Sequence, residues 1–174
     1  WRGSDVNLRK MNASRNLPVA PRPSLAAVVV TYRPKASVLE HLRRLGRLTE
    51  NIIVVDNATD GVSAPLIEAA GKLPGVRLVR NPVNLGIAAA LNQGIRLALE
   101  SGTGWIATFD QDTGIPEDFF GRLLRIYETC PLALEVGMVV PGGWVEPGAV
   151  APTQPPCAVT WSVVWGAVNS GSLI

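Results

Sequence analysis

Two acidic residues separated by a single position, Asp110 and Asp112, are the first feature of the sequence that could do chemistry. They follow the apolar run 105–109, and side chains two residues apart in an extended chain point to the same face. Because two close carboxylates repel each other, a divalent cation bound between them is favoured. The pair therefore indicates a Mg²⁺ or Mn²⁺ site, at which the metal would neutralise a departing diphosphate. The alternative is a solvated turn whose acidic side chains precede the next helix.

A further acidic residue, Asp56, ends the apolar run 52–55 and is followed by Asn57. In dinucleotide-binding folds an acidic residue at this place contacts a ribose, whereas the alternative is a turn-forming pair. Residues 31–35, which follow the first apolar run, contain no glycine, so the Gly-x-Gly-x-x-Gly phosphate loop is absent. The Walker-type Gly-Lys-Ser/Thr loop is absent from the sequence too. A phosphate bound by this chain would therefore need a metal, which the acidic pair could hold.

Small and polar residues surround the start of the longest segment with helical periodicity. Asn84 is interpreted either as the N-cap of a helix there or as a ligand contact. Gly86 would let the backbone approach a ligand closely. Asn92 is expected to be a buried amide that needs partners, either in the core or on a ligand. By contrast, His41 lies off the apolar stripe of residues 36–48 and is predicted to be a surface residue.

Short apolar runs alternate with segments of helical periodicity along the chain. Strands are predicted over 25–30, 52–55, 76–79, 105–109, 136–140 and 158–168, and helices over 36–48, 63–72, 86–100 and 116–127. The helix over 86–100 is expected to bury a stripe of Ile87, Leu91, Ile95 and Leu99. This alternation predicts an α/β domain with a mostly parallel central sheet and flanking helices.

Right-handed crossovers place the carboxyl ends of such strands at one edge of the sheet, where ligands bind. The polar residues that follow the predicted strands are therefore expected to meet at that edge. They are Thr31, Tyr32, Asp56, Asn57, Asp110 and Asp112.

The 174 residues indicate one domain, with a flexible lead-in over 1–24 and a nucleotide-binding domain over 25–174. A net charge of +2 argues against nucleic acid as a partner. No apolar run reaches the roughly 18 residues of a membrane span, and no secretory leader is visible, so a cytoplasmic location is expected. Because the chain begins without Met and ends inside an apolar run at Ile174, it is expected to be a fragment.

Four motifs, in their order and spacing, resemble those of the family 2 glycosyltransferases of the GT-A fold. They are VVVTY at 28–32, VVDN at 54–57, NLGIAAALNQGI at 84–95 and DQD at 110–112. The last two, with NSGSLI at 169–174, are most similar to the bacterial rhamnosyltransferase branch. The resemblance covers residues 25–174 and implies a GT-A domain that is incomplete at its C-terminus.

The resemblance implies an inverting enzyme that uses a nucleotide-diphosphate sugar, usually dTDP-L-rhamnose in this branch or else a UDP-sugar. The acceptor would be a surface polysaccharide or a lipid-linked glycan, which is compatible with a peripheral place at the inner face of the membrane. By similarity, Thr31 and Tyr32 would line the pyrimidine pocket, and Asp56 would hydrogen-bond the base with Asn57 beside it. The nucleoside would be bordered by Asn84, Gly86 and Asn92. Asp110 would contact ribose or metal, and Asp112 would hold the metal.

The general base of the family is expected beyond Ile174, so donor and metal binding is the function expected of this chain. The alternative from a different class is a non-catalytic interaction module that keeps the fold. A nucleotidyltransferase is disfavoured because residues 31–34 do not supply the Gly-rich, Arg-containing loop of that class.

Overall fold

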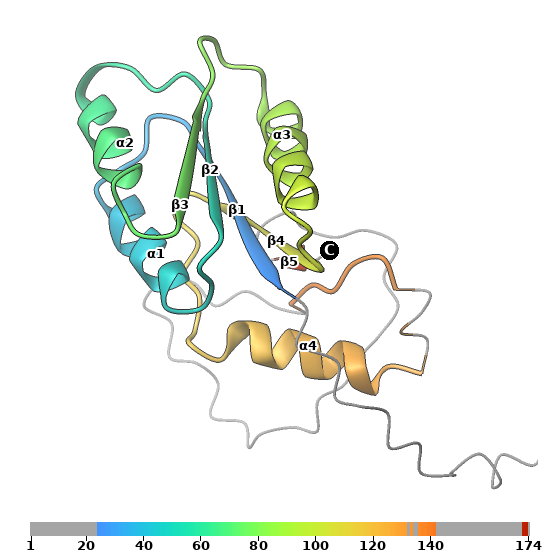
Figure 1. The fold of residues 1–174 in the computed structure, drawn as a ribbon. Coiled ribbons are helices and arrows are strands. Elements are labelled where there is room, and N and C mark those ends of the chain that lie inside the picture. Colours follow the sequence, from blue (N-terminus) through green and yellow to red (C-terminus); the bar gives the residue numbers. More distant parts are fainter. Residues whose placement is uncertain (1–23, 132, 134–135, 142–171, 174) are drawn as a thin grey trace, which may run out of the picture.

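A computed structural model describes residues 24–131, 133, 136–141 and 172–173. The strands of these residues form one sheet in the order β3-β2-β1-β4-β5, in which all neighbours are parallel except β4 and β5 (Figure 1). The strands are β1 Leu25–Thr31, β2 Ile52–Asp56, β3 Val76–Arg80, β4 Trp105–Asp110 and β5 Ser172–Leu173. The helices are α1 Ser37–Gly46, the 3-10 turn η2 Gly61–Ser63, α2 Ala64–Ala70, α3 Ile87–Glu100 and α4 Phe119–Thr129. The predicted α/β domain with a mostly parallel sheet is confirmed.

Helices cover both faces of the sheet, with α1 and α2 on one side and α3 on the other (Figure 1). Strand residues alternate between two cores, as the pleat requires. Ala27, Val29, Ile52, Val54 and Phe109 pack with residues of α1, α2 and α4. Ala26, Val28, Val30, Ile53 and Val55 pack with residues of α3. Burial on both faces explains why the central strand β1 and its neighbour β2 are apolar runs up to their last residue, whereas the edge strand β3 carries Arg77 and Arg80.

The buried face of α3 differs from the predicted stripe. It consists mainly of small residues, namely Ala90, Leu91, Gly94 and Ala98. Ile87 and Leu99 are instead more than half exposed, so the prediction that they belong to the core is wrong. The reason is the close approach of the helix to the sheet: a Cβ at position 94 would lie well inside van der Waals contact with the side chain of Val28. Sheet contact therefore selects the smallest side chains rather than the most apolar ones.

Two further predictions about the elements are wrong. Helix α4 begins at Phe119 rather than at Pro116, because the chain first makes a turn in which the Phe119 N–H donates to the Pro116 carbonyl. Residues 136–140 form no strand, and only Val139 makes an isolated bridge. Gly137 interrupts this apolar run, and a glycine weakens a strand.

The predicted strand over 158–168 and the lead-in over 1–23 lie outside the described residues, as do 169–171 and 174 of the C-terminal motif. Among the helices that the structure describes, none has the length and apolar character needed to span a bilayer.

Candidate functional site

The strand register brings the polar strand ends together at one edge of the sheet. Thr31 at the end of β1 pairs with Asp56 at the end of β2, and Asp56 pairs with Arg80 at the end of β3. On the other side of β1, Val30 pairs with Asp110 at the end of β4. The predicted meeting of these strand ends is therefore present, and Arg80 joins it.

The two faces of this edge carry different residues. By alternation along their strands, Thr31, Asp56 and Arg80 belong to the face covered by α1 and α2. Asp110 alternates with Phe109 and so belongs to the face covered by α3. Asp110 thus approaches the edge from the face opposite to that of Asp56, whereas Asp112 lies in the turn after β4, where alternation no longer applies.

Asp56 is almost fully buried, with 1% of its surface exposed, and its carboxylate is largely engaged. One oxygen accepts a hydrogen bond from the Thr31 hydroxyl at 3.2 Å. The other accepts from the backbone N–H of Thr59 at 3.3 Å and lies 3.7 Å from Nε of Arg80. A carboxylate has about four acceptor positions, so these partners leave roughly one for a ligand.

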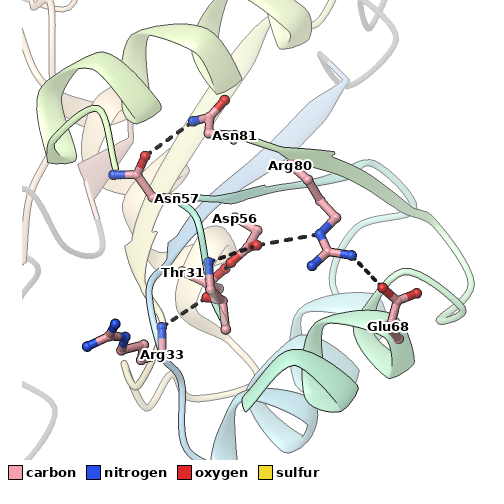
Figure 2. A network of polar contacts seen from close by, with 8 residues as sticks. Thr31, Arg33, Asp56, Asn57, Glu68, Arg80 and Asn81 are labelled. Atoms are coloured by element: carbon pink, nitrogen blue, oxygen red, sulfur yellow. Dashed lines mark hydrogen bonds and ion pairs between the residues drawn. The ribbon is translucent and has the colours of Figure 1, made fainter. Parts of the chain in front are cut away.

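Arg80 links Asp56 to helix α2. Its Nη1 donates to the carboxylate of Glu68, while its Nε faces Asp56 (Figure 2). Sequence reasoning missed both Arg80 and Glu68, although a basic residue that ends β3 beside a predicted strand-end acid was a visible signal.

A cavity of about 480 Å³ opens beside this network. Its lining residues come from the loop after β2 and from the end of β3, namely Asp56, Ala58, Thr59, Asp60, Arg80, Asn81 and Pro82. The cavity therefore presents a carboxylate next to a guanidinium, but neither Asp110 nor Asp112 is among its lining residues.

The side-chain amide of Asn57 holds the loop that leads into α3. Its Nδ2 donates to Oδ1 of Asn84 at 2.7 Å, and its Oδ1 accepts from Leu85 N at 2.9 Å and from Nδ2 of Asn81 at 3.3 Å. Figure 2 shows the contact between Asn57 and Asn81. Because Asn57 is buried and its amide makes three hydrogen bonds to this loop, it shapes the edge by fixing the loop.

Of the two interpretations of Asn84, the N-cap is wrong, and so is the predicted burial of Asn92. The N-cap is Gly86, at φ 81°, and Asn84 instead accepts from the Gly86 N–H at 2.9 Å in a turn just before the helix. A positive φ of this kind favours glycine, which explains the residue at 86. Asn92 is exposed rather than buried, because the helix presents its small residues to the sheet.

The loop with the acidic pair contacts the loop after β1. The Tyr32 N–H donates to Oε1 of Gln111 at 2.9 Å. Asp110 is half-buried and Asp112 is exposed, but the chain turns at Gln111 and Asp112, so the extended conformation expected for the pair is wrong. The two carboxylates supply oxygen ligands, which fit a hard cation. The described residues contain no group of three or more His, Cys, Asp or Glu that could hold a metal, so such a cation would need ligands from a bound phosphate or from water.

Arg33 and Ala58 hold left-handed backbone conformations, at φ 47° and 69°, which are uncommon for residues other than glycine. Arg33 is fixed by a hydrogen bond from its backbone N–H to the Thr59 hydroxyl and by an ion pair with Asp60 at 3.0 Å, and its guanidinium lies 5.1 Å from the centre of the partly exposed Tyr32 ring. Such strained positions gather at ligand sites, and both of these border the edge that carries Asp56.

His41 is buried, with 5% exposed, so its prediction as a surface residue is wrong. It packs edge-on against Phe109 at 5.7 Å, and neither ring nitrogen has a hydrogen-bond partner among the described residues. Burial lowers the pKa of His41 to about 4, with a smaller lowering contribution from Arg44 and an opposing one from Asp112. The imidazole is therefore neutral at pH 7.

A mostly parallel sheet with helices on both faces and polar residues at the carboxyl edge defines the class of doubly wound α/β domains, in which ligands bind at that edge. Within that class, the chain belongs to glycosyl transferase family 2, whose family model matches residues 27–166.

Comparison with individual proteins agrees with this assignment. The chain is 37% identical over 103 residues to the dTDP-rhamnosyl transferase RfbF of Shigella flexneri, covering 58% of this chain and 33% of that protein. Its fold is similar to that of the mannosyltransferase PcManGT of Pyrobaculum calidifontis, solved with GDP-Man and Mn²⁺ (TM-score 0.51, 22% identity, 68% of this chain and 35% of that one). It is also similar to residues 1–349 of TarS of S. aureus, solved with UDP-GlcNAc (TM-score 0.51, 15% identity, 60% of this chain and 31% of that one). The chain thus spans about a third of the length of each of these relatives, at 33%, 35% and 31%.

Proposed function

We propose that this chain is the donor-binding part of an inverting glycosyltransferase that transfers L-rhamnose from dTDP-L-rhamnose. The acceptor is a growing polysaccharide or a lipid-linked glycan. Family membership and the similarity to a dTDP-rhamnosyl transferase support this donor. The observation that carries the proposal is the buried Asp56 carboxylate, set next to Arg80 in the wall of a cavity at the carboxyl edge of the sheet.

The cavity complements the imide edge of thymine or uracil. Such a base presents an N–H donor flanked by carbonyl acceptors, and the wall presents an acceptor, Asp56, flanked by a donor, Arg80. Thr31 orients Asp56 through its hydroxyl, and the exposed ring of Tyr32 offers an apolar surface beside the base. Cytosine has no imide N–H and would leave the open acceptor position of Asp56 without a donor from the base, so cytosine nucleotides should bind more weakly.

The remaining residues border the rest of the nucleotide. Asn57 and Asn84 fix the loop before α3, where Gly86 leaves its backbone open to a ribose. Asn92 faces outward from the same helix. A nucleotide is long enough to pass over the edge of the sheet, with its base near Asp56 on one face.

The diphosphate would then reach the acidic pair at the end of β4. Asp110 and Asp112 would hold Mg²⁺ or Mn²⁺ there, and the metal would neutralise the negative charge of the leaving diphosphate. Donor binding is the part of the reaction that this proposal assigns to the chain, because the chain spans only about a third of the length of the relatives described above.

The test is calorimetric titration of the chain with dTDP, UDP and CDP, with and without Mn²⁺. We expect Mn²⁺ to raise dTDP affinity about tenfold, the effect of one strong charge interaction, and Asp112→Asn to remove that increase. Asp118→Asn is the matched control, because Asp118 is an exposed acid at the start of α4. Equal dTDP affinity with and without metal would contradict the metal site. A folded chain that binds no nucleotide would favour the interaction module instead.

A further inference from the structure

Arg80 lies between two carboxylates that come from different elements. Asp56 is its register partner on β2, and Glu68 projects from α2 (Figure 2). The contact to Glu68 is a close hydrogen bond through Nη1, whereas Nε of Arg80 lies 3.7 Å from Asp56. A separation of 3.7 Å is too long for a hydrogen bond, so Arg80 is directed by Glu68 and only lies near Asp56.

The guanidinium would hold Asp56 more tightly if Glu68 were absent. An arginine and a carboxylate prefer a bidentate pair with two parallel hydrogen bonds. Such a pair would fill both acceptor positions of Asp56 that Thr31 and Thr59 leave open. It would also turn the remaining N–H groups of Arg80 away from a ligand in the cavity.

The contact between Glu68 and Arg80 adds little to folding. Both side chains are exposed, at 60% and 44%, and exposed ion pairs stabilise a protein weakly. Asp56, in contrast, is 1% exposed in the same network. The exposed Glu68 carboxylate therefore acts mainly on the orientation of the Arg80 guanidinium, which lies beside the buried Asp56 carboxylate.

We propose that Glu68 is a positioning residue for nucleobase recognition. It holds Arg80 in the cavity wall, so that Asp56 keeps an acceptor for the N–H of the base and Arg80 keeps a donor for a neighbouring carbonyl. This inference rests on the proposed function, because it assigns a base to the cavity beside Asp56.

The test compares dTDP affinity and thermal stability in the wild-type chain and in Glu68→Gln, which keeps the size of the side chain and removes its charge. We expect dTDP affinity to fall about tenfold, as for the loss of one charge-assisted contact, with an unchanged melting temperature. Glu68→Asp, which restores the carboxylate, should recover part of the affinity. Glu100→Gln is the matched control, because Glu100 is an exposed glutamate at the end of α3 and removes the same charge.

A double-mutant cycle with Arg80→Gln isolates the path of the effect. In the Arg80→Gln background, Glu68→Gln should cause no further loss of affinity, because Glu68 acts only through Arg80. Additive losses, an unchanged affinity in Glu68→Gln, or a melting temperature that falls together with affinity would each overturn the positioning role. Absence of dTDP binding by the wild-type chain would overturn the proposed function itself and this inference with it.

Discussion

The two oxygens of the buried Asp56 carboxylate accept hydrogen bonds from a hydroxyl and a backbone N–H, and a guanidinium lies 3.7 Å away. Each of these partners is a donor, and the base N–H assigned to the cavity is a donor too. A carboxylate satisfies all of them because it only accepts. An asparagine at position 56 would instead direct the N–H donors of its amide at one of these donor groups, and the two donors could not pair.

Asp56→Asn should therefore lower both stability and nucleotide affinity. We expect a loss of about 1–3 kcal/mol in the free energy of unfolding, the cost of a buried donor left without an acceptor. The affinity for dTDP should fall at least about tenfold for the same reason. Urea unfolding and calorimetry measure the two effects. Thr31→Val serves as the comparison because it removes only the hydroxyl donor, and a loss as large as that of Asp56→Asn would contradict the role given to the carboxylate.

His41 makes the stability of the chain depend on pH. Its folded pKa of about 4 lies below its ordinary value of 6.5 because burial disfavours the charged ring, while Asp112 and Arg44 act on it in opposite directions. The unfolded chain thus binds a proton between these values that the folded chain does not bind. Stability from this group is present above pH 6.5 and is lost as the pH falls towards 4.

The size of this effect at pH 4.5 should be about 2–3 kcal/mol relative to pH 7. His41→Phe, and His41→Leu as a smaller replacement, should remove it, since His41 is the only histidine in the sequence. Urea unfolding of the three proteins at the two pH values isolates the contribution, because the carboxylates remain the same in all of them. An equal change in the free energy of unfolding between the two pH values in the wild type and the variants would contradict the contribution of His41.

At the scale of elements, helix α3 lies against the sheet with Gly94 at its closest point. A methyl group there would press on the side chains of Val28 and Val55. Gly94→Ala should destabilise the fold by about 1–3 kcal/mol, despite the better helix propensity of alanine, because overpacking outweighs propensity.

Gly121→Ala in α4 is the matched control. A Cβ at that position would contact nothing within 4 Å, so alanine should stabilise the chain by up to about 1 kcal/mol. Urea unfolding of both variants provides the comparison. Opposite signs are expected, and an equal stabilisation would show that α3 can move away from the sheet at no cost.

The helices and parallel strands were predictable from the sequence because burial on both faces leaves unbroken apolar runs separated by helical periodicity. The buried face of α3 was not predictable in the same way, since apolar periodicity favours Ile87 and Leu99 while close packing favours Ala90 and Gly94. The strand predicted at 136–140 failed for a local reason, the glycine within it. Apolar periodicity thus indicates which segments are buried, but not how closely a helix approaches the sheet.

The candidate site was predictable only in part. Thr31, Asp56 and Asp110 were found because each follows an apolar run, and strand ends of a parallel sheet meet at one edge. Arg80 and Glu68 were missed because their role depends on a contact between β3 and α2 that no spacing reveals. Asn92 was misplaced together with the face of its helix.

At the scale of the whole molecule, the proposed base subsite beside Asp56 and the proposed diphosphate subsite at Asp110 and Asp112 lie at the ends of two different strands, β2 and β4. The loop after β1 touches the loop after β4 through Tyr32 and Gln111, so a nucleotide crossing the edge would contact segments far apart in the sequence. Binding to the folded state alone stabilises it, by about 2.7 kcal/mol at a ligand concentration one hundred times the dissociation constant.

For a chain of this length, that stabilisation should raise the melting temperature by about 5–10 °C. The rise with dTDP should be larger in the presence of Mn²⁺ than in its absence, because in the proposed site the metal would link the diphosphate to Asp110 and Asp112. With dTDP and Mn²⁺ present, Asp112→Asn should retain only the metal-independent part, since the base would still reach Asp56 at the end of β2. Differential scanning calorimetry measures both increments. Loss of the entire shift in Asp112→Asn would contradict separate base and diphosphate subsites, because it would make them one indivisible site.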